Sequence, residues 1–340
     1  MTNEGMNSGS VVCVTGAGGY IGSWLLKNLL QNGYTVHATL RDIGDEKKCR
    51  PLLDLTGAHE RLKLFQADLL QEGSFDSAVE GCQGVFHVAN PVPPGNECSL
   101  EDFIVTSVNG VLNVMRACTR AKSVRRMVLT SSLSTACPMN DKGELACPCI
   151  DESCWSDVDI LGSQTNKAAW YGASKTLEEQ EALKYGAENK LEVVTLLPSL
   201  VLGPWFTNIP GYTSLQTIIA LIGENDLLYE QLKSIQSMTG SIAIVHIDDI
   251  CNAHIFLMEH PDAQARYICS GDSRSINSLK QLLSKQLNVS IKLDDEEPVN
   301  RDVPISSKKL LDMGFCYKYS LEQTLEESVR CAIKNGFLKL

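Results

Sequence analysis

A tyrosine and a lysine, four residues apart, could together move a proton to or from a substrate. Tyr171 and Lys175 lie in the stretch YGASK, inside a helical pattern from about Ala168 to Glu188. Residues with this spacing share one face of a helix. An ammonium group beside a phenol favours its ionised form, so the tyrosine can act as a general acid toward a carbonyl and as a base in the reverse direction. Such a pair is common on helix surfaces and needs support from the rest of the chain.

Hydroxyl groups upstream of this pair give that support. An apolar run at 126–130 has the character of a buried strand and leads into Thr130, Ser131 and Ser132. A hydroxyl at the end of such a strand can donate a hydrogen bond to a substrate oxygen on which negative charge develops. The combination of these hydroxyls with a tyrosine and a lysine is more specific than either feature alone.

A glycine-rich turn near the N-terminus indicates a dinucleotide cofactor. Gly16, Gly19 and Gly22 follow a short apolar run and open an amphipathic helical pattern. Glycine permits the tight turn and the close approach of a pyrophosphate, at which the following helix points its N–H groups. A glycine turn without a ligand is the alternative, and the strand–turn–helix context favours the cofactor site.

The end of the second apolar run bears on the choice between NAD and NADP. An acidic residue there binds the ribose 2′-hydroxyl, whereas an arginine suits the 2′-phosphate. Arg41 takes the first position after Leu40, and Lys48 supplies a second cation. We predict NADP(H). Two alternatives stay open: Arg41 could pair with Asp42 or Asp45 on the surface, and Asp42 could serve NAD.

These groups need a scaffold that brings them to one edge, and the chain pattern supplies it. Short apolar runs alternate with helical patterns from Val11 to Leu197, which predicts a parallel sheet with helices on both faces. The expected fold class is α/β, a Rossmann-type doubly wound parallel sheet with a smaller, mostly C-terminal substrate lobe. We predict an NADP-binding domain over residues 10–198 plus about 242–260, and a substrate-binding lobe over 199–241 and 261–340.

The composition disfavours several other classes of protein. A formal net charge of −11 repels nucleic-acid phosphates, and no apolar run approaches the roughly 20 residues of a membrane helix. The polar first ten residues do not resemble a secretory leader, so we expect a cytoplasmic protein. The 13 cysteines lack zinc-site spacing, and we expect no metal. A reversible disulfide among Cys147, Cys149 and Cys154 stays open.

Together these features resemble the extended short-chain dehydrogenase/reductases. Within them the chain is similar to the plant group of dihydroflavonol 4-reductase, anthocyanidin reductase, vestitone reductase and cinnamoyl-CoA reductase. The matching stretches include VCVTGAGGYIGSWL, VLTSS, DESCWSDVD, YGASKTLEEQEALKYGAE, HIDDICNAHIFL and YICSG. The resemblance implies that NADPH delivers hydride to an aromatic or phenolic substrate, and it implies the catalytic serine role for Ser132 beside Tyr171 and Lys175.

The resemblance also implies which residues contact the cofactor. Arg41 and Lys48 would hold the 2′-phosphate, and Asp68 would lie near adenine, although an aspartate that caps its own loop is an equal alternative there. The cofactor-binding residues that we predict are Gly16, Gly19, Tyr20, Ile21, Gly22, Arg41, Lys48, Asp68, Leu69, Val88, Ala89, Thr130, Tyr171, Lys175 and Pro198.

The candidate substrate contacts include positions at which this chain differs from the usual residues of this group. Dihydroflavonol reductases usually have an asparagine where this chain has Cys137, and cysteine is a poor replacement for an amide. The stretch 231–244 looks closer to anthocyanidin reductases. The residues that we predict to contact substrate are Asn90, Cys137, Trp205 and Tyr212; the last two could equally be core residues of the smaller lobe.

Two other functions remain open at the level of sequence. A sugar-nucleotide epimerase or dehydratase with retained NAD shares the glycine turn and the tyrosine–lysine pair. A non-catalytic dinucleotide-binding redox sensor shares the fold. Arg41 and DESCWSD argue against the first, and the presence of Ser132, Tyr171 and Lys175 argues against the second. The sequence does not indicate an oligomeric state or the natural substrate.

Overall fold

A seven-stranded parallel sheet forms the centre of the computed structural model, which describes residues 9–90, 98–140, 145–165, 167–207, 214–222, 226–293 and 303–338. Its strand order is β3-β2-β1-β4-β5-β6-β9. The strands are β1 Val11–Thr15, β2 Thr35–Leu40, β3 Leu62–Gln66, β4 Gly84–His87, β5 Arg126–Thr130, β6 Glu192–Pro198 and β9 Ala265–Cys269. The order reverses between β1 and β4, which is where such sheets bind ligands. The predicted α/β fold class is confirmed.

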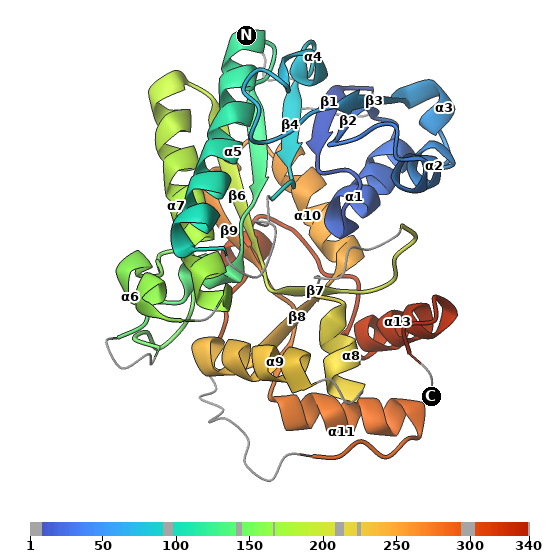
Figure 1. The fold of residues 1–340 in the computed structure, drawn as a ribbon, viewed down its shortest axis with the longest axis vertical. Coiled ribbons are helices and arrows are strands. Elements are labelled where there is room, and N and C mark those ends of the chain that lie inside the picture. The colour runs from blue at the N-terminus through green and yellow to red at the C-terminus, as the bar shows by residue number, and fades with distance from the viewer. Residues whose placement is uncertain are drawn as a thin grey trace.

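Helices cover both faces of this sheet because its strands are apolar on both sides (Figure 1). Val12 and Val14 pack into a core shared with α1 (Tyr20–Gln31) and α10 (Ile247–Glu259). Cys13, between them, packs into the opposite core with α4 (Asp76–Val79), α5 (Leu100–Ala121) and α7 (Lys167–Asn189). This is expected because successive strand residues point to opposite faces. The shorter helices α2, Glu46–Leu53, and α3, Ala58–Arg61, lie between β2 and β3 in the chain, and α6, Val158–Ser163, packs against α7.

A second, three-stranded sheet lies beyond the carboxyl ends of the large one. Its order is β10-β8-β7, formed by β7 Leu200–Leu202, β8 Ile242–His246 and β10 Ser273–Arg274. Helices gather around it at the lower end of the molecule in Figure 1, namely α8 Gln216–Ile222, α9 Asp226–Thr239, α11 Ile276–Leu287 and α13 Leu321–Lys334. The short α12, Lys308–Asp312, packs against β9 instead.

Strand pairing departs from the expected domain boundaries at two places. β9 falls in the stretch assigned to the substrate lobe, yet it is the edge strand of the large sheet beside β6. β8 falls in the stretch assigned to the cofactor domain, yet it pairs with β7 and β10. α10, which follows β8, packs against α1 and β5. The chain thus crosses between the sheets several times. The division into two domains stays a prediction, in which β9 would belong with the cofactor domain and β8 with the substrate lobe.

Candidate functional site

A cavity of about 510 Å³ lies at the carboxyl ends of the central strands. Val88, Thr130 and Pro198, at the ends of β4, β5 and β6, line one side of it. Residues of the smaller sheet and its helices line the other side, among them Leu232 of α9 and Ala243 of β8. The cavity is therefore placed where a parallel α/β sheet binds its ligands.

Tyr171 and Lys175 of α7 both line this cavity. The Lys175 ammonium donates to the Thr130 carbonyl at 2.9 Å and forms an ion pair with Glu178 at 2.5 Å. Burial alone would lower the pKa of Lys175, but the nearby Glu178, Tyr171 and Glu179 outweigh it and raise that pKa. Lys175 thus keeps its positive charge at the wall of the cavity, next to the phenol.

Ser132 also lines the cavity, directly after β5. It has an extended backbone and begins the short 3₁₀ helix η1, Leu133–Ala136. Its Oγ accepts a hydrogen bond from the Ser134 backbone N–H at 3.2 Å and lies 2.9 Å from the Ser134 hydroxyl. The structure therefore brings all three predicted catalytic residues to one cavity.

Two buried neutral histidines lie behind the site, and the sequence analysis did not identify them. The Thr15 hydroxyl accepts from two backbone N–H groups, so its own proton goes to His87 Nδ1 at 2.8 Å. Burial, and then the charge of Lys175, lower the pKa of His87 to about 3. His254 Nδ1 donates to a carbonyl, so its Nε2 accepts from the Thr130 hydroxyl, and burial lowers its pKa to about 4. Both rings hold strand-end threonines without adding charge.

The glycine turn between β1 and α1 has the shape of a pyrophosphate cradle. Gly16 has φ +70°, and a Cβ there would lie 2.8 Å from Cα of Ala89. A Cβ on Gly22 would lie 2.3 Å from the Gly16 carbonyl oxygen. Gly19 precedes α1 without a capping side chain, and the first turn has no acidic residue. The helix start therefore keeps N–H groups available for an anion, and the turn fits a dinucleotide.

Lys48 lies beside this turn, and Arg41 directly follows β2. Arg41 is exposed after β2 and makes no ion pair with any residue that the structure describes. Lys48 lies near Gly18 and pairs with Asp45 at 3.1 Å. Asp42 accepts from the Gly44 N–H in its own loop. Neither aspartate takes up the Arg41 guanidinium, which is free to meet an anion.

Of the remaining predicted cofactor residues, some line the cavity and others lie in the core or in a turn. Ile21 lines the cavity, whereas the Tyr20 side chain is buried in the large core. Asp68 accepts from the Leu70 N–H at 2.9 Å, and the Leu69 carbonyl accepts from Asn113. Asp68 thus caps its own turn, and its contact with adenine stays a prediction.

The predicted substrate residues are only partly brought together. Asn90 lines the cavity, and its amide oxygen has no hydrogen-bond partner among the described residues. Cys137 is buried with its thiol donating to the Leu133 carbonyl, and Trp205 packs against Phe337; neither lines the cavity. The η1 turn is what directs the Cys137 side chain back into the protein. Tyr212 lies outside the described residues.

Helix α9 supplies cavity residues that the sequence analysis missed. Leu228, Gln231, Leu232 and Ile235 line the cavity. Their spacing is the signal that could have revealed them, because positions i, i+4 and i+7 share one helical face. The hydroxyl of Ser199, directly after β6, lines the cavity too and has no hydrogen-bond partner among the described residues.

Within the described ranges, no group of three or more His, Cys, Asp or Glu side chains is arranged to hold a metal ion. None of the described helices is both long and apolar enough to cross a membrane. Cys147, Cys149 and Cys154 are free thiols.

Known proteins resemble this chain over nearly its whole length. Residues 12–269 match the model of the "NAD dependent epimerase/dehydratase family". The chain is 46% identical to the "Putative anthocyanidin reductase" of Ginkgo biloba, covering 97% of this chain and 96% of that one. It is 41% identical to the dihydroflavonol 4-reductase of Callistephus chinensis, covering 98% and 89%. Among solved structures, vestitone reductase from alfalfa (Medicago sativa L.) matches with a TM-score of 0.81 and 34% identity, covering 96% and 99%.

Proposed function

Since this chain belongs to the NAD dependent epimerase/dehydratase family, we propose that it is an NADP(H)-dependent reductase of an aromatic or phenolic small molecule. The similarity to named plant reductases confirms the resemblance to the extended short-chain reductases. The observation that carries the proposal is a single cavity lined by Ser132, Tyr171 and Lys175 on one side and by apolar side chains of α9 on the other.

The chemistry follows from these side chains. NADPH, when bound, supplies the hydride. Tyr171 would donate its phenolic proton to the substrate oxygen, or remove a proton from the alcohol in the reverse direction. The buried ammonium of Lys175 would stabilise the phenolate, and Ser132 would donate a hydrogen bond to the same oxygen.

The cofactor preference rests on Arg41. Its free guanidinium follows β2, where a 2′-phosphate would lie, and Lys48 lies close to the glycine turn. A planar bidentate donor suits a phosphate. The pyrophosphate would lie over the Gly16–Gly22 turn at the start of α1.

The substrate preference rests on the character of the cavity. Leu228, Leu232 and Ile235 offer apolar surface to a flat ring system, while Asn90 and Gln231 offer polar groups at its edge. Such a site suits a flavonoid-type substrate of plant specialised metabolism better than a sugar nucleotide. A cytoplasmic location is part of this proposal, because 13 scattered cysteines suit a reducing compartment.

A substrate panel tests the proposal. The purified protein is mixed with NADPH and, separately, with anthocyanidins, dihydroflavonols, isoflavonoid ketones and cinnamoyl thioesters, while NADPH absorbance is followed and products are identified by mass spectrometry. We expect NADPH consumption with at least one phenolic class. Tightly bound NAD in the purified protein, together with interconversion of sugar nucleotides and no NADPH consumption, would favour the epimerase alternative instead.

A further inference from the structure

A buried ion pair lies directly behind the loop that carries Ser132. Glu179 of α7, one helical turn after Lys175, pairs with Arg266 of β9, with 2.9 Å between Oε1 and Nε. The Glu179 side chain is fully buried and that of Arg266 is 5% exposed. Because burying two charges is costly, such a pair persists only when further hydrogen bonds satisfy both partners. The residues that these hydrogen bonds hold in place therefore indicate the role of the Glu179–Arg266 pair.

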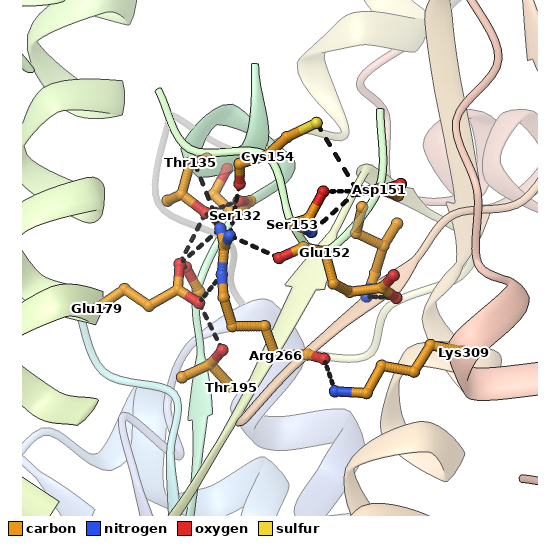
Figure 2. Close-up of polar contacts among 12 residues, drawn as sticks. Ser132, Thr135, Asp151, Glu152, Ser153, Cys154, Glu179, Thr195, Arg266 and Lys309 are labelled. Carbon is orange, nitrogen blue, oxygen red and sulfur yellow. Dashed lines mark hydrogen bonds and ion pairs between the residues drawn. The ribbon is translucent and has the colours of Figure 1, made fainter. Parts of the chain in front are cut away.

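The Glu179 carboxylate binds both sides of the Ser132 loop. Its Oε2 accepts from the Ser131 hydroxyl at 2.8 Å and from the Thr135 hydroxyl at 2.7 Å. Its Oε1 accepts from the Thr195 hydroxyl at 2.5 Å, on the neighbouring strand β6. Figure 2 shows this carboxylate between Thr135 and Thr195. Ser132 therefore lies between two residues that are tied to one charged group.

Arg266 ties the DESCWSD segment, 151–157, to the same group. Its Nη2 donates to the Thr135 hydroxyl at 3.0 Å, and its Nη1 donates to the carbonyls of Glu152 and Cys154 (Figure 2). Its guanidinium lies 3.5 Å from the ring centroid of Trp155, a favourable cation–π distance. The segment is thereby wrapped around the arginine.

The far end of the same segment reaches the other side of the Ser132 loop. The Ser156 hydroxyl contacts the Ser134 carbonyl at 2.6 Å and accepts from the Cys137 N–H at 2.9 Å. The turn that follows Ser132 is thus held from two directions, by Glu179 and by Ser156. Among the described residues, the Ser132 hydroxyl makes its hydrogen bonds with Ser134, so the direction of its Oγ depends on this backbone.

We propose that Glu179 is a positioning residue for the reaction: with Arg266 it fixes the Ser131–Thr135 turn so that the Ser132 hydroxyl faces the cavity. The inference rests on the proposed role of Ser132. Charge-assisted hydrogen bonds are stronger than neutral ones, and a donor contributes most to catalysis when it is held in place before charge develops. In this proposal the DESCWSD segment has a supporting function, because it holds Arg266 on one side and the Ser134 carbonyl on the other.

Threonine variants test this with a control inside the same network. Thr135→Val removes the hydroxyl that lies 2.7 Å from Glu179 Oε2 and 2.9 Å from the Ser132 carbonyl and that accepts from Arg266, so it detaches the Ser132 loop from the ion pair. Thr195→Val removes a bond between Glu179 and β6. Thr135→Ser retains the hydroxyl. Glu179→Gln is a fourth variant. It leaves the Arg266 charge buried without a charged partner, which is strongly destabilising, so the test relies on the comparison of Thr135→Val with Thr195→Val. Steady-state kcat, KM for NADPH and melting temperature are measured for each.

We expect Thr135→Val to lower kcat about tenfold, since small misplacements of catalytic groups have effects of this size or larger, with KM for NADPH unchanged. Thr135→Ser should restore kcat, and Thr195→Val should lower the melting temperature while kcat stays at the wild-type value. A wild-type kcat in Thr135→Val, or an equal loss in Thr195→Val, would overturn the positioning role. An inactive wild-type protein across the substrate panel would overturn the proposed function, and this inference with it.

Discussion

At the scale of single residues, the proposed reaction depends on one phenol, Tyr171, beside one buried ammonium, Lys175. Tyr171→Phe removes the exchangeable proton and keeps the ring. We expect kcat to fall at least about 10²-fold, the range of general acid–base catalysis, while the affinity for NADPH, measured by fluorescence titration, stays nearly unchanged. Tyr185→Phe is the matched control, because Tyr185 lies on the same helix and its hydroxyl contacts Thr119 away from the cavity. Full activity in the Tyr171 variant would remove Tyr171 from the mechanism.

Also at the residue scale, the neutral histidines make folding sensitive to acid. The folded-state pKa of His254 is about 4, below the ordinary value of 6.5, so the unfolded chain binds the extra proton first. The stability from this residue is fully present above pH 6.5 and is lost as the pH falls toward 4, at about 1.4 kcal/mol per pH unit.

Urea unfolding between pH 7.5 and 4.5 measures this dependence. We expect the unfolding free energy of His254→Gln to fall less steeply with acid than that of the wild type, because glutamine can keep both hydrogen bonds without taking up a proton. His87, with a pKa of about 3, remains in both proteins and acts as the internal reference. Identical slopes would mean that His254 does not titrate differently in the two states.

At the scale of elements, the sequence patterns predicted those helices and strands whose formation depends on residues adjacent in the chain. The helix predicted after the glycine turn is observed as α1, Tyr20–Gln31, because a strand end, three glycines and a leucine stripe follow one another directly. The small sheet was not predicted, since its strands at 200–202, 242–246 and 273–274 pair across long separations. Cys137 was misplaced for a similar reason: its direction depends on η1, which distant hydrogen bonds from Glu179 and Ser156 hold.

Helix α9 is the element that we expect to contact the substrate and not the cofactor. Gln231 lines the cavity from α9. We expect Gln231→Ala to raise KM for the substrate without changing KM for NADPH. Glu230→Ala is the matched control, because Glu230 is exposed, does not line the cavity and pairs with Lys233 along the helix. A parallel rise in both KM values would show that α9 has no selective contact with substrate.

At the scale of the whole molecule, the chain crosses between two sheets so that one cavity receives groups from both. The large sheet and its helices contribute Ser132, Tyr171 and Ile21 to the cavity, and the smaller sheet with its helices contributes the apolar wall. Net hydride transfer from NADPH to the substrate is the activity that we propose for this arrangement, whereas an epimerase would keep its hydride within one bound cofactor.

Isotope transfer tests that claim most directly. The protein is incubated with NADPH deuterated at the nicotinamide C4, in the two stereochemical forms separately, and with the substrate that the panel identifies; the product is then analysed by mass spectrometry. We expect that one form transfers deuterium to a carbon of the product, with one equivalent of NADP⁺ formed for each hydride transferred, and that Tyr171→Phe transfers none. A product that carries no deuterium from either form, made without net oxidation of NADPH, would contradict it.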